Sequence, residues 1–200
     1  KSINAGLQMP AIALTDHVGW SNCAVVAEQI GRACENYRRY AGIIAIPGVE
    51  ITHVPAAGIA EVAAIAKGAG ARLVVVHGET PVEPVEPGTN RAAVCCPDVD
   101  VLAHPGFLTA EEAALAAQNG VYIEISGRKG HSLTNGHVVQ TGRAAGVRFL
   151  INSDAHSPGD LISIEMARKV GRGAGLGEEE LVGVMERNPG MLLERLGIPS

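Results

Sequence analysis

Five histidines in the sequence stand directly after short apolar runs: His17, His53, His77, His104 and His156. Apolar runs rich in Val and Ile predict buried β-strands, and the C-terminal ends of parallel strands lie at one edge of a sheet. A single histidine at such a position more often has a structural role. Five at matching positions are expected to converge on one site.

Carboxylates share this placement at the strand ends: Asp16, Glu50, Glu79, Glu124 and Asp154. Imidazoles and carboxylates crowded together desolvate one another unless a cation holds them. Mixed nitrogen and oxygen ligands suit Zn, Mn or Fe better than Ca or Mg. The pattern therefore predicts a centre for divalent metal and a metal-dependent hydrolase.

Other kinds of catalytic site lack their sequence signatures. The chain has no G-x-S-x-G nucleophile elbow and no G-x-x-x-x-G-K-[ST] loop. The glycine-rich run at 171–177 follows an expected helix rather than a strand, which favours a flexible connector over a dinucleotide site. Cys95 and Cys96 precede an expected strand, away from the histidines, so a catalytic thiol is disfavoured.

Apolar strands and amphipathic helices alternate along the chain, which is typical of a parallel α/β fold. The expected strands are 11–15, 42–52 (broken at Pro47-Gly48), 72–76, 99–103, 121–126 and 147–152. The expected helices are 23–40, 59–69, 110–119, 136–145, 161–170 and 178–187, with a helix end at 1–7, a last helix from Asn188 and a loop at 78–90. Thr109 and Glu112 predict a capping box, and Gly120 a helix stop. The alternation alone fits a closed barrel or an open sheet.

The composition favours one cytoplasmic domain over residues 1–200. Aromatic residues make up only 3% of the chain, as in parallel cores built from Val, Ile, Leu and Ala. The net charge of −5 and the scattered Lys and Arg residues disfavour nucleic acid as a partner, and no apolar stretch is long enough to span a membrane. The four cysteines form no C-x-x-C pair and no signal peptide is visible, so reduced thiols are expected.

Five motifs come in the order typical of the PHP (polymerase and histidinol phosphatase) family. They are T-D-H at 15–17, P-G-V-E at 47–50, V-H-G at 76–78, L-A-H-P-G at 102–106 and N-S-D-A-H at 152–156. The sequence resembles this family over nearly its whole length. The resemblance implies a distorted parallel (β/α)7 TIM-like barrel and a phosphoesterase with two or three divalent ions (Zn, Mn or Fe). The first strand of that barrel, with an H-x-H motif, is not in this chain and is expected within about 25 residues upstream of Lys1.

The resemblance also implies six metal ligands, namely His17, Glu50, His77, His104, Asp154 and His156. Glu50 would bridge two ions, and Asp154 would bind a further ion together with the upstream H-x-H pair. His77 and His104 would complete one site, while His17 and His156 would serve another. A hydroxide bridging two metals ~3.5–4 Å apart would attack phosphorus, with Glu50, His104 and Asp154 as the catalytic residues.

A phosphorylated substrate also needs cations, and the loop at 127–136 supplies Arg128, Lys129 and His131 as candidate substrate-binding residues. Arg128 could hold a phosphate bidentately, and a solvated basic loop is the alternative interpretation. Glu124 is expected to orient a ligand rather than to bind metal.

The remaining polar residues near the strand ends have weaker predictions. Asp16 is expected to point away from the site by strand alternation or to orient a ligand. His53 is a candidate on the substrate side, and Glu79 is a candidate for contact with the site. His137 is expected in the first turn of a helix without a catalytic role.

Three functions remain open, of which hydrolysis of a small phosphomonoester is preferred because of the motif order. The first alternative is an amidohydrolase-type enzyme that cleaves C–N bonds on a similar barrel. The second is a non-catalytic or polymerase-associated PHP module that binds metal for stability, although the retained ligand set argues against a dead site.

Overall fold

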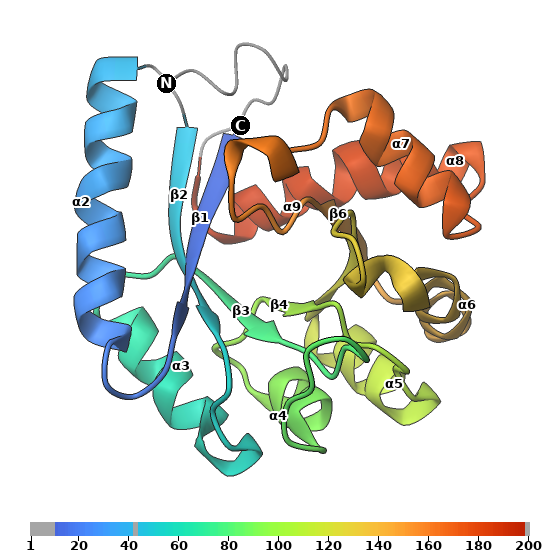
Figure 1. Ribbon diagram of the computed structural model, residues 1–200, viewed down its shortest axis with the longest axis horizontal. Coiled ribbons are helices and arrows are strands. Elements are labelled where there is room, and N and C mark those ends of the chain that lie inside the picture. The colour runs from blue at the N-terminus through green and yellow to red at the C-terminus, as the bar shows by residue number, and fades with distance from the viewer. Residues whose placement is uncertain (1–10, 42–43, 199–200) are drawn as a thin grey trace.

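Six parallel strands form one curled sheet in the computed structural model, which describes residues 11–41 and 44–198. The strands are β1 (Ala11–Val18), β2 (Ile44–Ile51), β3 (Leu73–His77), β4 (Val101–Ala103), β5 (Tyr122–Ser126) and β6 (Phe149–Asn152). They lie side by side in chain order, and each neighbouring pair is parallel. Helices surround the sheet (Figure 1). The expected α/β alternation is therefore confirmed.

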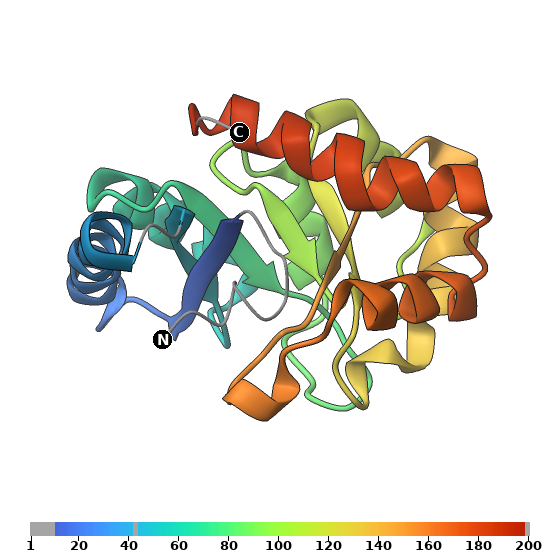
Figure 2. The same ribbon diagram turned by 90° about the horizontal axis from the view of Figure 1, so that it is seen from above.

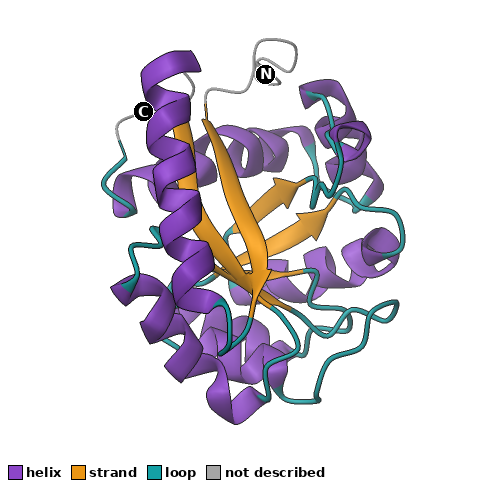
Figure 3. Cartoon of the chain, turned by 60° about the vertical axis from the view of Figure 1, so that its left-hand side comes forward, coloured by secondary structure: helices purple, strands orange, loops and turns teal. Residues whose placement is uncertain are grey.

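The expected seven-stranded barrel is wrong. In the described part of the chain the sheet has six strands, with β1 at one edge and β6 at the other. A barrel closes only when the first and last strands pair, and these two edges do not. The result is a curled half-barrel, whose fanned strands are visible in Figure 3. The helix end expected at 1–7 lies outside the described residues.

The helices follow the expected pattern with one addition. They are α2 (Cys23–Ala41), α3 (Ile59–Gly68), α4 (Thr89–Cys95), α5 (Ala110–Asn119), α6 (Asn135–Ala145), α7 (Ile164–Gly173), α8 (Glu178–Val182) and α9 (Asn188–Arg195), with a π-helical turn at 183–187 between the last two. The capping box of Thr109 and Glu112 and the left-handed Gly120 are confirmed. Helix α4 was not predicted, and its first two residues fall in the loop expected at 78–90; it begins after Gly88, which has a φ of 94°. None of the described helices combines the length and apolar character needed to cross a bilayer.

Strand β2 runs without the break that was expected at Pro47-Gly48. Proline lacks only the N–H, and the Pro47 carbonyl accepts a hydrogen bond from the backbone N–H of Arg72 at 2.8 Å. Glycine is required beside it, because a Cβ at Gly48 would lie 2.8 Å from the carbonyl oxygen of Leu73. Glu50 therefore lies on a continuous, regular strand, which determines the direction of its side chain.

Strand alternation divides the sheet into an outer face, covered by helices, and an inner face. The outer core contains Val49, Val74, Leu102 and Ile123. On the inner face, Ile46, Leu73, Val101, Tyr122 and Leu150 pack against Leu192 and Leu196 near the end of the chain. Figure 2 shows this last segment, in red, running along the sheet. Farther along the same strands the inner side chains are polar. The polar groups therefore lie at the C-terminal strand ends, beyond the apolar contacts with the last helix.

Candidate metal centre

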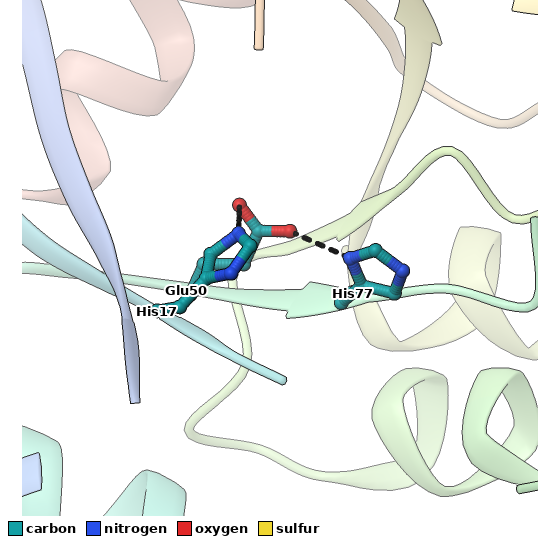
Figure 4. Close-up of side chains that lie close together, drawn as sticks. All are labelled: His17, Glu50 and His77. Atoms are coloured by element: carbon teal, nitrogen blue, oxygen red, sulfur yellow. Dashed lines mark ion pairs between the residues drawn. The ribbon is translucent and has the colours of Figure 1, made fainter. Parts of the chain in front are cut away.

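The first group of possible metal ligands comes from three neighbouring strands. His17 of β1 and Glu50 of β2 are directly paired in register, and His77 ends β3. Glu50 Oε2 lies 3.8 Å from His17 Nε2, and Glu50 Oε1 lies 3.4 Å from His77 Nδ1. Figure 4 shows the carboxylate between the two rings. All three ligand atoms lie within 4.8 Å of one another, which suits one ion.

His104 extends this group from the end of β4. Its Nε2 lies 3.0 Å from His77 Nδ1 and 3.6 Å from Glu50 Oε1. Both rings are buried at 2% exposure, so water does not screen the contact. Glu50 Oε2 thus faces His17, while Oε1 faces both His77 and His104.

The second group of possible ligands is His104, His131 and Asp154. His131 Nε2 lies 3.7 Å from Asp154 Oδ2, and the His131 ring stacks on His104 at 4.2 Å between centroids. The hydroxyl of Thr80 contacts His131 Nδ1 at 2.9 Å. His131, expected to bind substrate, therefore lies within a donor set.

Backbone strain is concentrated at these residues. In the described ranges 11–41 and 44–198, the non-glycine residues with positive φ are His53 (55°), His104 (27°) and Asp154 (46°). Such conformations cost of order 1–3 kcal/mol each and persist where surrounding structure enforces them, commonly at functional sites. All three side chains face the same mouth of the half-barrel.

Hydrogen bonds orient the two buried imidazoles. His77 Nε2 donates to the backbone oxygen of Glu83 at 3.3 Å, and His104 Nδ1 donates to Glu124 Oε1 at 3.4 Å. The other nitrogens, His77 Nδ1 and His104 Nε2, face each other at 3.0 Å. Glu50 Oε1 points at both and, among the described residues, is the buried side-chain polar atom without a hydrogen-bond partner.

His77 Nδ1 lies 3.0 Å from His104 Nε2, and Glu50 Oε1 lies 3.4 Å from His77 Nδ1 and 3.6 Å from His104 Nε2. Ligand atoms around a tetrahedral Zn²⁺ with nitrogen and oxygen donors are about 3.3 Å apart. A divalent ion would therefore fit between these atoms and would satisfy the orphaned oxygen. The orienting carboxylate behind His104 and the carbonyl behind His77 are typical partners of metal-binding histidines.

The titration properties of the cluster show a shortage of positive charge. Burial lowers the pKa of His104, but the hydrogen bond and charge of Glu124 outweigh it and raise that pKa. Burial, with the charges of Glu124 and Glu50, raises the pKa of Asp154 to about 6. Burial, with the charges of His104 and His77, lowers the pKa of His131 to about 4, so this ring is a neutral ligand near pH 7. A bound cation would relieve the excess of carboxylates.

The remaining predicted ligand, His156, lies at the open side of the cluster. Its side chain is 47% exposed, and its Nδ1 is 3.5 Å from Asp154 Oδ1. Its ring lies 5.4 Å from that of His17 between centroids. His156 is thus close to both groups, although it belongs to neither.

Arg128, predicted to bind substrate, lies at this open side. Its Nη1 contacts His156 Nδ1 at 2.7 Å and the backbone oxygen of Asp154 at 2.9 Å. Lys129 is exposed and stands apart from the cluster. Both line a cavity of about 330 Å³ together with Ser153 and Asp160.

Glu83 was not predicted from the sequence. It lies in the loop after β3, with Oε1 3.6 Å from His53 Nε2 and Oε2 3.8 Å from His131 Nε2. Nothing marks it out among the acidic residues of that loop. Glu79, a candidate for contact with the site, instead accepts hydrogen bonds from the backbone N–H groups of Gly88 and Asn90 and holds the loop against α4.

Three further predictions concern residues beside the ligands. Glu124 lies behind His104 and accepts a hydrogen bond from Asn152 at 3.2 Å, as expected for an orienting group. Asp16 is exposed. His137 lies in the first turn of α6, where its Nε2 contacts the Leu108 carbonyl at 2.8 Å.

Comparison with known proteins gives one relative in sequence and a likeness in fold. No protein-family model matches the chain. Uncharacterized protein MJ1295 of Methanocaldococcus jannaschii is 47% identical over 191 residues, covering 95% of this chain and 88% of that protein. A crystal structure of an amidohydrolase superposes on 84% of this chain with a TM-score of 0.53 and 16% identity. This chain spans about half (46%) of that amidohydrolase, and the likeness shows a shared fold.

Proposed function

This chain belongs to the same family as the M. jannaschii protein MJ1295, and we propose that it is a metal-dependent hydrolase acting on small phosphomonoesters. The observation that carries the proposal is the buried Glu50 Oε1, which lacks a hydrogen bond and faces two buried imidazole nitrogens. A buried carboxylate oxygen without a partner is costly, and a divalent cation between these three atoms would satisfy it.

Each residue of the cluster has a defined task in this proposal. Glu50 would join two ion positions through its two oxygens, and His104 would be held in place by Glu124. His131 and Asp154 would complete the second donor set. Bound divalent ions lower the pKa of water and neutralise charge on a phosphoryl group.

The preference for phosphoesters rests on a motif order that resembles that of the PHP family and on the cations beside the cluster. Arg128 and Lys129 line the cavity next to Asp154 and His156. A guanidinium matches the geometry of a phosphate, and a nearby ammonium adds positive potential. A phosphorylated substrate would place its ester at the ions and its remaining oxygens against these groups.

A second candidate is hydrolysis of a C–N bond, as the fold likeness to an amidohydrolase favours. The same ions that neutralise a phosphoryl oxygen can polarise an amide carbonyl. The two reactions need different contacts beyond the ions, so a comparison of substrates separates them.

The test is turnover of a panel of phosphomonoesters and cyclic amides by protein purified without chelators, with EDTA and metal add-back as controls. We expect phosphate release that EDTA abolishes, and loss of at least about 100-fold of that rate in Glu50→Gln and His104→Ala. Amide turnover without phosphate release would favour the second candidate. Chelator-sensitive stability without any turnover would identify a metal-binding module, and full activity in both variants would contradict the proposed site.

A further inference from the structure

Arg128 occupies an unusual position for a substrate-binding arginine, because its guanidinium sits on the ligand atoms. Nη1 is 2.7 Å from His156 Nδ1 and 2.9 Å from the Asp154 backbone oxygen, and Nε is 3.6 Å from Asp154 Oδ2. The guanidinium therefore contacts the two predicted ligands contributed by the segment after β6.

This contact places a permanent positive charge against His156. Arginine remains protonated in proteins and only donates hydrogen bonds. Nδ1 is also the ring nitrogen that faces Asp154, 3.5 Å from Oδ1 and 3.2 Å from the backbone oxygen. Arg128 therefore covers the side of His156 that faces Asp154.

We propose that the Arg128 guanidinium takes the place of a cation at Asp154 and His156 in the metal-free protein, and competes with divalent metal for these two residues. It supplies positive charge where burial and neighbouring carboxylates surround Asp154 with negative charge. Metal binding on this side requires the guanidinium to leave. This inference rests on the metal site of the proposed function.

The structure provides a place for the displaced side chain. The cavity of about 330 Å³ beside the cluster is lined by Arg128 itself and by Gly127, Lys129, Ser153, Asp160 and Ile162. The Arg128 side chain is already 30% exposed. The carboxylate of Asp160 lines the same cavity.

The experiment is titration of metal-free wild-type protein, Arg128→Ala and Lys129→Ala with Mn²⁺, followed by calorimetry. Lys129→Ala is the matched control, because it removes the neighbouring positive charge without touching His156 or Asp154. Competition predicts that Arg128→Ala binds Mn²⁺ roughly 10- to 100-fold more tightly at one position, since hydrogen bonds to charged groups no longer have to be broken. Lys129→Ala should bind like the wild type or only slightly more tightly.

Weaker binding of Mn²⁺ by Arg128→Ala than by the wild type would overturn the inference. If Arg128 merely supports the ligands, its removal weakens Mn²⁺ binding, and an unchanged affinity also contradicts competition. A wild type that binds no Mn²⁺ would instead refute the proposed function.

Discussion

Replacement of Glu50 by glutamine should abolish metal binding without harming the metal-free fold. Glu50 Oε1 has no hydrogen-bond partner, so the neutral amide loses no stabilising contact. Its NH₂ group can donate to His77 Nδ1, 3.4 Å from the oxygen that it replaces. The free energy of unfolding of the metal-free variant should therefore equal or exceed that of the wild type.

The size of the effect follows from linkage. Metal at 100 times its Kd stabilises the protein that binds it by about 2.7 kcal/mol. For a chain of 200 residues each kcal/mol raises the Tm by roughly 2–4 °C, so the wild type should gain about 5–10 °C. Glu50→Gln should gain close to none of this.

The matched control is Asp100→Asn, a buried carboxylate at the other end of the sheet. Asp100 is fully paired, with Lys67 Nζ at 2.7 Å, Arg195 Nη2 at 3.1 Å and the Val74 backbone N–H at 2.9 Å. Its replacement should lower the free energy of unfolding of the metal-free protein by about 1–3 kcal/mol and leave the metal-induced shift intact.

Differential scanning fluorimetry with EDTA and with added Mn²⁺ or Zn²⁺ measures both effects in one experiment. The two variants should behave oppositely, one losing the metal-induced shift and the other losing basal stability. If Glu50→Gln keeps the full metal-induced shift, Glu50 is not a ligand and the reasoning from its orphaned oxygen is wrong.

Three further outcomes follow from the structure. Metal affinity should fall as the pH decreases, and metal binding should release protons. The reason is that the hydrogen bond which His104 donates to Glu124 outweighs burial and raises the pKa of His104, which must be deprotonated to bind metal. Calorimetry in buffers of different ionisation enthalpy that shows no proton release would contradict this. Ellman's reagent should label Cys95, which is exposed, but not Cys34, whose pKa burial raises to about 11, and rapid labelling of Cys34 in the native protein would contradict its burial. Gly106→Ala should cost at least about 2 kcal/mol in urea unfolding, since φ is 67° and a Cβ would lie 1.9 Å from a carbonyl oxygen of the loop after β3; an unchanged midpoint would refute this.

The convergence of the ligands could be predicted from the sequence because it depends only on local pattern and parallel topology. His17, Glu50 and His77 end or nearly end their strands, and parallel pairing brings those ends to one edge. Alternation along each strand then determines which side chains face inward, as it does for Asp16 and His17. These rules hold whether the sheet closes or stays open.

Closure of the sheet could not be predicted in this way. It depends on how far the strands curl and on what fills the inner face, which are properties of tertiary packing. Here Leu192 and Leu196 cover the inner apolar residues, and β1 and β6 remain unpaired at the edges of the described sheet. The resemblance to a seven-stranded family therefore overstated the similarity of the architecture.

The contacts made by side chains on loops also could not be predicted from the sequence. Glu83 and Thr80 reach His131 only because Glu79 and Asn90 hold the loop after β3 against α4. Such contacts leave no periodic pattern in the sequence. The placement of Arg128 on His156 is of the same kind, since a loop composition indicates a nearby cation but not which atom it touches.

The most direct test of the central claim is the metal content per chain, measured by elemental analysis of protein purified without chelators or a nickel column. The two donor groups predict about two equivalents of Zn, Mn or Fe in the wild type, and a clear loss in Glu50→Gln. A wild-type protein that contains no metal and takes up none on dialysis against these ions would contradict the claim.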